Sequence, residues 1–395
     1  MSTEQQEPTS PYPALDLLDL DSQLNELERA FRDDVRAFVD ARIRPSIGAW
    51  YDDAYFPREL VPELGALGLL GTTITGYGCP GRSAVEYGLG VMELEAGDSG
   101  IRTFVSVQGS LAMSAIAKFG SEAQKNELLP RMASGELIGC FALTEPTAGS
   151  DPSAMLTTAQ RDGDEWVLHG SKRWIGMASI ADLAIVWART ADGVRGFIVP
   201  TTTPGFTATV IEPKLSMRAS IQCDIELDVR LPADAILPDT TGLGSAFACL
   251  SEARYGIVWG AMGAARDSLE TARDYALQRV QFGKPIAGHQ LVQRTLVELL
   301  LPVQRGTLLA LHLGRLKDRG RLTPAQISLG KLGNVRDAIA VCREARTVLG
   351  GNGITTEHSP LRHANNLESV RTYEGTDEVH TLVLGQAITG IAAYR

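Results

Sequence analysis

The chain has 395 residues, 44% of them hydrophobic and 21% charged, which is the composition of a globular protein with room for two or three domains. Its net charge of −10 at pH 7, without a block of Lys or Arg, argues against a nucleic-acid or membrane-surface partner. Five scattered Cys without a CxxC pair and an acidic N-terminus without an apolar run predict a cytoplasmic protein with no disulfide framework.

The first third of the chain has helical periodicity. Residues 1–20 are polar and contain Pro, so a frayed arm is expected there. From residue 21 the apolar side chains recur at steps of three and four, which predicts an amphipathic helix closed by Pro45, with Leu24, Leu27, Phe31, Val35 and Phe38 on its buried face. Further helices are expected at 57–70, 83–97, 103–119 and 122–134, which makes 21–139 a helical domain.

Between residues 140 and 237 the pattern changes to short runs rich in Val, Ile, Trp and Thr, separated by turn residues. Such runs predict a small antiparallel β domain built from EWVLHG, DLAIVWART, RGFIVP, FTATVIE and CDIELDVRLP. Helical periodicity returns in the domain 238–395, with helices expected at 242–278, 291–316, 323–349 and 376–393. Thr323 followed by Pro324 is a typical helix start. The predicted fold class is α+β, mostly α.

Several residues could bind a ligand, although each also has an ordinary structural interpretation. The segment LTEPTAGSDP (143–152) offers hydroxyls and free amides that could surround a polar ring, or it is a plain turn. Trp174 could flank a planar cofactor or belong to the core. Arg279 and Phe282, at a helix end, could meet a phosphate or purine, or the arginine could simply stabilise the helix C-terminus.

Glu374 is the strongest candidate for an acid or base. It precedes Gly375 and the cap-like Thr376 in a tight loop, and the alternative is a carboxylate that only caps the next helix. His358 and His363 beside Glu357 form the closest approach to a metal-ligand cluster, but their spacing favours surface or helix-terminal positions, and no metal site is expected.

Seven strings in order resemble the acyl-CoA dehydrogenase family across residues 20–395: LTEPTAGSD, WIG, ARYG, ALQRVQFGKPI, HQL, VLGGNGI and YEGT. The resemblance implies an N-terminal helical domain, a central β domain and a C-terminal helical bundle. Stretches such as GTTITGYGCPG, DSGIRTFVSVQGS and RHANNLESVRTYEGTDEVH are more similar still to the branch of the family that oxidises glutaryl-CoA.

The resemblance implies FAD bound against the β domain, with its flavin ring surrounded by Leu143, Thr144, Ser150, Trp174, Ile175 and Gly176, and with Thr376 nearby. The family commonly has Thr at the position of Gly176, so a hydroxyl expected near flavin N5 is missing here. A second group resembles positions that reach the FAD of a neighbouring subunit: Arg279, Phe282, Gln290, Thr347, Gly350 and Gly351. A homo-oligomer, a tetramer built from dimers, is therefore implied.

Glu374 matches the catalytic base of most family members, whereas Ala253 stands where some branches carry that base. The base must be a carboxylate beside the weakly acidic α C–H of a thioester, and burial next to an apolar chain should raise its pKa. Three further residues match positions near the acyl-CoA: Ser150, Arg254 and Gly375.

In the glutaryl-CoA branch, the positions of Arg102 and Ser106 hold the distal carboxylate of the substrate, and Glu95 and Tyr373 match polar positions of the same branch. A guanidinium suits this role because its charge-assisted pair with a carboxylate is strong and directional. The alternative for Arg102 is an exposed residue after Gly100. The resemblance thus implies oxidation of glutaryl-CoA, decarboxylation to crotonyl-CoA and transfer of electrons to an electron-transfer flavoprotein.

Two other functions stay open. One is an acyl-CoA dehydrogenase for another short, branched or dicarboxylic acyl-CoA, without decarboxylation. The other is a non-catalytic binding or assembly subunit, which Glu374 disfavours and for which Gly176 leaves some room.

Overall fold

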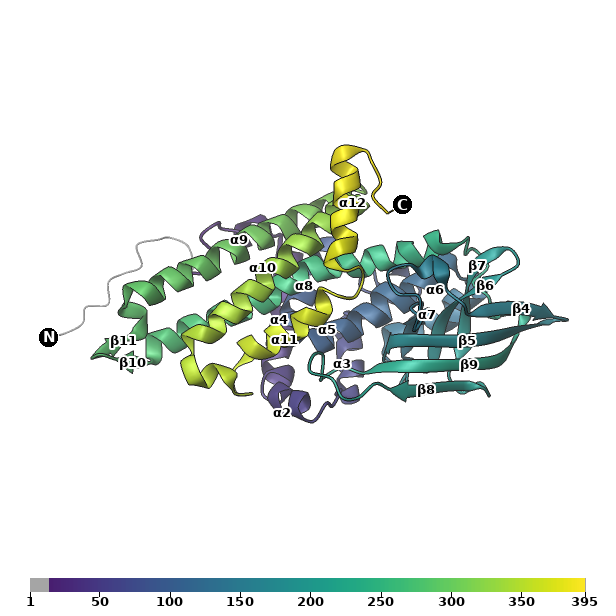
Figure 1. The fold of residues 1–395 in the computed structure, drawn as a ribbon, viewed down its shortest axis with the longest axis horizontal. Coiled ribbons are helices and arrows are strands. Elements are labelled where there is room, and N and C mark those ends of the chain that lie inside the picture. Colours follow the sequence, from purple (N-terminus) through teal and green to yellow (C-terminus); the bar gives the residue numbers. More distant parts are fainter. Residues whose placement is uncertain (1–13, 395) are drawn as a thin grey trace.

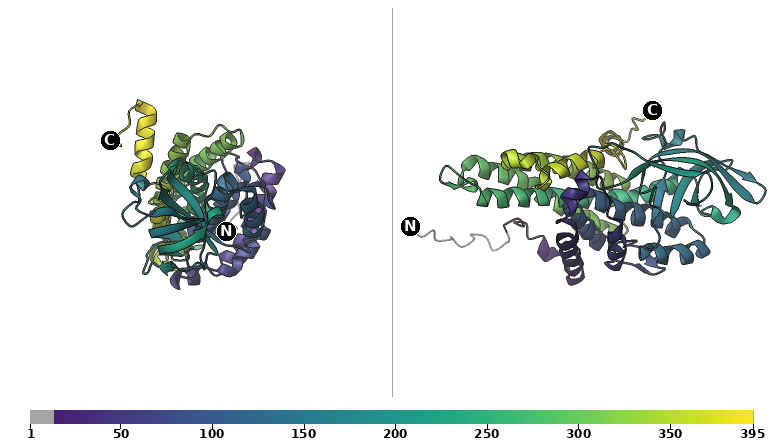
Figure 2. Two further views of the ribbon diagram at one scale, coloured as in Figure 1. Left: turned by 90° about the vertical axis from the view of Figure 1, so that its right-hand side faces the viewer. Right: turned by 90° about the horizontal axis from the view of Figure 1, so that it is seen from below.

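The computed structural model describes residues 14–394. Long helices form an elongated bundle that carries a β-sheet at one end, and the small hairpin of β10 (Val280–Gln281) and β11 (Lys284–Pro285) lies at the opposite end (Figure 1). The C-terminal helix α12 (Asp377–Thr389) projects from the side of this body, as Figure 1 and the left view of Figure 2 show. The α, β, α order expected from the sequence is confirmed.

The N-terminal helices pack into one core with the C-terminal bundle. Their bounds are α1 (Glu26–Phe38), α2 (Ile47–Asp52), α3 (Val61–Ala66), α4 (Ala84–Gly97), α5 (Ser99–Val105), α6 (Ser114–Phe119) and α7 (Glu122–Ala133), with π-helical turns at Val39–Ile43 and Ser106–Met113. The predicted buried face of α1 is wrong at Leu27, which is 71% exposed. Glu28 takes the inner position instead, because its carboxylate caps α1 and pairs with Arg315.

The seven-stranded sheet has the order β3-β6-β4-β5-β9-β8, with β7 paired to β6. Its strands are β3 (Gly139–Ala142), β4 (Thr158–Asp162), β5 (Glu165–Gly176), β6 (Leu183–Thr190), β7 (Gly193–Pro200), β8 (Phe206–Val210) and β9 (Gln222–Pro232). Most pairs are antiparallel, as expected, but β3 and β4 both run parallel to β6. A long connection containing β4 and β5 separates β3 from β6, so no hairpin forces them to run in opposite directions. Two short hairpins complete the strands: β1 (Thr75–Gly76) with β2 (Cys79–Pro80), and β10 (Val280–Gln281) with β11 (Lys284–Pro285).

The C-terminal bundle consists of α8 (Leu243–Gln278), α9 (Gln290–Asp318), α10 (Pro324–Val348), α11 (Ser359–Val370) and α12. Thr323 caps α10 as predicted, in a reciprocal capping box with Gln326. By length and composition α9 could cross a membrane, but it packs against α8 and α10, and 39% of its most apolar window is buried. Three of its apolar side chains remain more than half exposed: Leu291, Val297 and Leu301.

Helix α11 was not predicted from the sequence. Its inward positions carry polar groups, which conceal the helical pattern, and each finds a buried partner. Asn366 donates to Asp98, and Nε2 of His363 lies 3.0 Å from a carboxylate oxygen of Asp267. The surface or helix-terminal position expected for His363 is therefore wrong, since the residue is fully buried inside α11.

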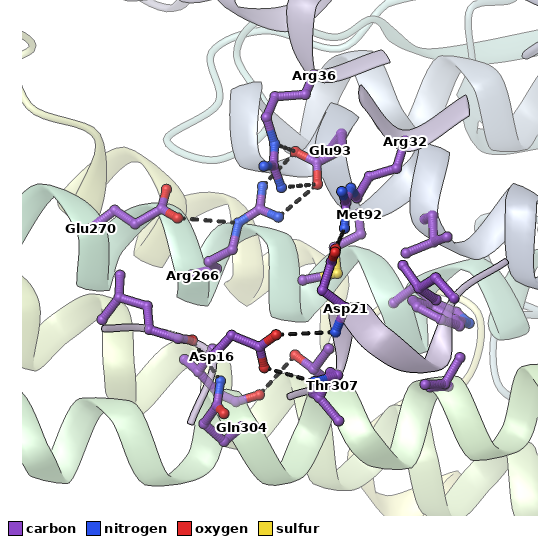
Figure 3. A pocket seen from close by; sticks show the side chains of 17 residues that line it. Asp16, Asp21, Arg32, Arg36, Met92, Glu93, Arg266, Glu270, Gln304 and Thr307 are labelled. Atoms are coloured by element: carbon purple, nitrogen blue, oxygen red, sulfur yellow. Dashed lines mark hydrogen bonds and ion pairs between the residues drawn. The ribbon is translucent and has the colours of Figure 1, made fainter. Parts of the chain in front are cut away.

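The expected arm up to residue 20 is wrong for residues 14–20, and its first 13 residues lie outside the described residues. Gln304 of α9 binds the backbone of Leu15 and Leu18, and Asp16 accepts from the N–H groups of Leu20 and Asp21. This segment covers a cavity of about 280 Å³ between α1, α4, α8 and α9 (Figure 3).

At the edge of this cavity, Glu93 of α4 is buried between two arginines (Figure 3). Each guanidinium binds both carboxylate oxygens, Arg36 of α1 at 2.9 and 3.1 Å and Arg266 of α8 at 2.6 Å. Burial alone would raise the pKa of Glu93, but the two cations outweigh it and lower this pKa to about 2. Glu93 and its two arginines therefore join the N-terminal helices to the C-terminal bundle.

We expect Glu93→Gln to lower the free energy of unfolding at pH 7 by about 3 kcal/mol, because a carboxyl with a depressed pKa stabilises the fold when ionised. In the wild type this contribution is complete above about pH 5 and is lost as the pH falls toward the native pKa of about 2. Urea unfolding at several pH values measures both effects. The control is Glu63→Gln, which breaks the exposed pair with Arg42 and should change stability by less than about 1 kcal/mol. Equal losses in the two variants would contradict this prediction.

Candidate active site

Glu374 lies in the loop between α11 and α12 with a left-handed backbone, φ 56°, followed by Gly375 at φ 91°. A left-handed non-glycine residue costs about 1–3 kcal/mol and persists only where its surroundings enforce it. Its Oε2 is buried and has no hydrogen-bond partner among the described residues. Thr376, not Glu374, caps α12 by accepting from the N–H of Val379, so the capping alternative for Glu374 is wrong.

Burial raises the pKa of the Glu374 carboxyl, and three nearby cations oppose that rise: Arg254, Lys331 and Arg102. A carboxylate that is buried, unpaired and surrounded by cations at a distance is suited to accept a proton. The geometry thus places a candidate general base here, at the residue that the sequence favoured.

The carbonyl groups of this loop are bound, while the N–H group of Glu374 has no acceptor in the described chain. Arg254 of α8 donates from Nε to the carbonyl oxygen of Glu374 at 2.7 Å, and Nε2 of His380 lies 3.2 Å from the same oxygen. Lys331 of α10 donates to the carbonyl oxygens of Tyr373 and Gly375. Within the described chain the N–H of Glu374 has no acceptor, so it can donate to a ligand.

Arg102 is 1% exposed, which excludes the alternative of a surface residue. Its Nε donates to Glu95 at 2.6 Å and its Nη2 to the Tyr373 hydroxyl at 2.7 Å. Glu95 also accepts from Ser99, and a Cβ at Gly260 of α8 would lie 2.0 Å from Glu95, so the glycine makes room for this pair. Nη1 of Arg102 has no partner among residues 14–394.

The break between α4 and α5 determines where Arg102 lies. Asp98 ends α4 and caps α5 by accepting from the N–H of Gly100 at 2.7 Å, and α11 holds Asp98 through Arg362 and Asn366. Ser106 follows Arg102 by four residues and is also buried, so the two share a helix face. Tyr373 then links this face directly to the Glu374 loop.

A second candidate region lies where β3 ends beside β5. Lys172 is fully buried, where it donates to Glu145 at 2.9 Å and to the carbonyl oxygen of Leu143 at 3.1 Å. Burial lowers the pKa of Lys172 to about 8, and Glu145 partly offsets this decrease. The N–H of Arg173 donates to Thr144. Sequence reasoning missed this ion pair, although Glu145 lies within the quoted LTEPTAGSD string.

Trp174 lies outside the core because β5 contains a bulge. The register shifts between Lys172 and Ile175, and Trp174 has φ 63° and is 53% exposed. Simple alternation from the buried Lys172 would have directed this indole inward, but one extra residue turns it outward. The core alternative for Trp174 is wrong, and the guanidinium of Arg173 lies 5.1 Å from the centre of its ring.

Comparisons with known proteins agree with this arrangement. Models of the N-terminal, middle and C-terminal domains of acyl-CoA dehydrogenase match residues 25–136, 140–229 and 240–389. The chain belongs to the acyl-CoA dehydrogenase family. Human short-chain specific acyl-CoA dehydrogenase, a mitochondrial protein, is 34% identical over 92% of this chain and 90% of its own length.

Two solved structures of a glutaryl-CoA dehydrogenase from Mycobacterium smegmatis resemble this acyl-CoA dehydrogenase more strongly. One, described as a complex with FADH2, is 57% identical with a TM-score of 0.95, and the other is 60% identical with a TM-score of 0.94. Each similarity covers 96% of this chain and 99% of the other.

Gly176 departs from the pattern common in this family, and the structure gives a packing reason for a glycine. A Cβ at Gly176 would lie 3.2 Å from Cγ2 of Val107 in the π-helical turn, closer than side-chain atoms normally approach. A larger residue at 176 therefore requires Val107 to move. Leu143 and Ile175 are buried beside this point, and Thr144 is half-buried.

The second group of predicted cofactor residues lies elsewhere in this acyl-CoA dehydrogenase. The β10–β11 hairpin and the end of α10 are at the far end of the bundle from the sheet (Figure 1). Phe282 is 93% exposed there, and the same end carries Arg279, Gln290, Thr347, Gly350 and Gly351. Within one chain these residues do not join the Glu374 or Trp174 regions, so any shared site with them needs a second chain.

Proposed function

We propose that this acyl-CoA dehydrogenase uses FAD to oxidise glutaryl-CoA, decarboxylates the product to crotonyl-CoA and passes the electrons to an electron-transfer flavoprotein. The observation that carries the proposal is the buried Arg102, with one unpartnered guanidinium nitrogen, joined through Tyr373 to the loop that bears Glu374. The similarity to two glutaryl-CoA dehydrogenase structures supports the same substrate.

The residues near Trp174 are compatible with FAD. A flavin needs a flat apolar surface and hydrogen-bond donors for its ring atoms. The exposed indole of Trp174 offers the surface, and Thr144 and Ser150 offer hydroxyls. The Lys172–Glu145 pair holds the loop beneath them. FAD bound here would supply the acceptor for the hydride that leaves the substrate β carbon.

Glu374 removes the α proton of the thioester in this mechanism. Because burial raises its pKa, its conjugate acid is closer in strength to the weak carbon acid, which makes it the better base. The negative charge that develops on the thioester oxygen needs a fixed donor, and the unpartnered N–H of Glu374 can donate to it. Arg254 and Lys331 occupy only carbonyl oxygens of the loop, so they leave this N–H available.

Arg102 binds the distal carboxylate of the substrate. Its Nε and Nη2 are occupied by Glu95 and Tyr373, so Nη1 is the remaining donor. Glu95 already neutralises the guanidinium in the absence of ligand, which offsets the desolvation cost of this buried cation. After oxidation, loss of CO2 places a carbanion in conjugation with the thioester, and Glu374, then protonated, can return a proton to it.

A homo-oligomer belongs to the same proposal. The exposed residues Arg279 and Phe282 would contact FAD only in a neighbouring chain, and α9 and α12 expose apolar side chains that a second copy can cover. We propose a tetramer built from dimers, which sedimentation analysis of the FAD-loaded protein will test.

Product analysis tests the catalytic proposal. The FAD-loaded enzyme is incubated with glutaryl-CoA and an artificial electron acceptor, and we expect crotonyl-CoA and CO2 in equal amounts. Accumulation of glutaconyl-CoA would instead support a dehydrogenase that does not decarboxylate. If glutaryl-CoA added without oxygen fails to bleach the flavin absorbance, the dehydrogenase proposal itself is wrong and the binding-subunit alternative is favoured.

A further inference from the structure

Lys331 lies in α10, which contributes no residue to the predicted substrate or base set. It is 1% exposed. Its ammonium group donates to two backbone carbonyl oxygens, those of Tyr373 and Gly375, the second at 2.6 Å. These are the residues on either side of Glu374. A buried lysine that binds both neighbours of a candidate base is placed to control that base, and neither the sequence motifs nor the comparisons assign it a role.

The whole loop is held through its carbonyl groups. The middle carbonyl, that of Glu374, accepts from Arg254 at 2.7 Å and from His380. Ser328, one turn before Lys331 on α10, lies 3.0 Å from Nδ1 of His380 and so orients that ring. Helix α10 therefore acts on three successive carbonyls, twice through Lys331 and once through His380. This arrangement enforces the left-handed backbone of Glu374.

We propose that Lys331 is a positioning residue for the proposed reaction: its ammonium group fixes the loop that carries Glu374 and stabilises the ionised form of that carboxylate. The inference rests on the proposed function, because Lys331 is assigned a role only if Glu374 is the base. Lys331 does not touch the reacting atoms and acts only through Glu374.

The charges around Glu374 come from several elements. Burial raises its pKa, and Arg254 of α8, Lys331 of α10 and Arg102 of α5 lower it. Burial also lowers the pKa of Lys331 to about 7, with Arg254 and Arg102 lowering it further and Glu374 and Asp377 of α12 opposing them. Burial lowers the pKa of His380 to about 4, so this ring is neutral at pH 7.

The neighbouring Tyr373 hydroxyl is neutral as well, because burial raises its pKa. Lys331 is consequently the one nearby cation in the described chain that titrates near neutral pH. The proton on Lys331 therefore affects how readily Glu374 ionises.

Two substitutions of Lys331 separate its hydrogen bonds from its charge. Lys331→Met removes both, and Lys331→Gln keeps N–H donors without the charge. Both should raise the pKa of Glu374 by about one to two units, since an opposite charge at this range has been removed. The acidic limb of the pH profile of kcat/KM should shift to higher pH by the same amount. Lys331→Met should additionally lower kcat by about tenfold or more as the loop loses two hydrogen bonds.

The control is Lys125→Met, a surface lysine on α7 paired with Glu122, which should leave the profile unchanged. Rates are measured with glutaryl-CoA and butyryl-CoA on FAD-loaded enzyme. The Glu374 carboxyl is also titrated by infrared difference spectroscopy against Glu374→Gln, a measurement that needs no turnover. A failure of the glutaryl-CoA proposal alone would change the preferred substrate and leave the carboxyl titration as expected.

Wild-type protein gives an independent test that does not depend on the folding of a variant. The carboxyl band of Glu374 should respond to pH in two steps, one its own ionisation and one near pH 7 from Lys331. A single step, or an unshifted titration in a folded Lys331→Gln protein, would overturn the proposal and leave Lys331 a purely structural residue.

Discussion

A Glu374→Gln enzyme is expected to bind FAD as the wild type does and to oxidise acyl-CoA about 10⁴-fold more slowly. The amide has nearly the shape of the carboxylate but cannot accept the α proton, and general-base catalysis contributes up to about that factor. Arg254, His380 and Lys331 bind backbone carbonyl oxygens of the loop, and none of these hydrogen bonds uses the Glu374 side chain. They should therefore keep the loop in place in the variant. Anaerobic addition of glutaryl-CoA should then leave the flavin absorbance unbleached.

Glu357→Gln is the matched control, because Glu357 is an exposed carboxylate in the preceding loop. Its rate should equal that of the wild type. Rapid bleaching in Glu374→Gln would show that another group takes the proton. Ala253, at the position where other branches carry their base, cannot be that group.

The pH dependence has a definite sign: a base with a raised pKa is active only when ionised, so kcat/KM should rise with pH through a value above 4.5.

Arg102→Gln should lower kcat/KM for glutaryl-CoA by about 10²- to 10³-fold, because a buried charge pair with the substrate carboxylate is lost. Pentanoyl-CoA has the same chain length with a methyl group in place of the carboxylate. For that substrate, the variant should change kcat/KM by less than about tenfold. The ratio of the two kcat/KM values therefore measures what Arg102 recognises, independent of general damage to the site.

The same variant should also lose about 3–5 kcal/mol of unfolding free energy, because Glu95 remains buried without its cation. The double variant Glu95→Gln with Arg102→Gln removes both charges, so it should recover most of this stability without recovering glutaryl-CoA oxidation. Recovery of both would mean that the pair is only structural. An unchanged substrate ratio in Arg102→Gln would contradict the dicarboxylate proposal.

Local signals in the sequence were sufficient for most helices and strands. Ser83 and Thr323 begin helices because their hydroxyls cap free N–H groups, a feature of a few consecutive residues. Alternating burial along β9 follows directly from alternating side chains in CDIELDVRLP. Short motifs in register likewise identified Glu374 as the candidate base, because YEGT is a local string.

Pattern reasoning failed where a distant partner changes what a residue can do. Glu28 could face inward because Arg315, far along the chain, pairs with it. His363 and Asn366 made α11 look like a polar loop, and only Asp267 and Asp98 explain their burial. The outward indole of Trp174 depends on a bulge in β5 that no alternation rule predicts.

The sequence by itself determined the family and the α, β, α order, and it pointed to Glu374 as the candidate base and to Arg102 as a candidate site residue, because each depends on residues adjacent in the chain or on a motif read in order. Only the tertiary structure revealed that Arg102 is buried and neutralised by Glu95, that Lys331 and His380 hold the loop of Glu374, and that Lys172 binds Glu145 and Leu143. The physical reason is that the desolvation and pairing of a charge depend on atoms brought together by packing, and a lysine 42 residues from its acceptor leaves no periodic signal in one sequence.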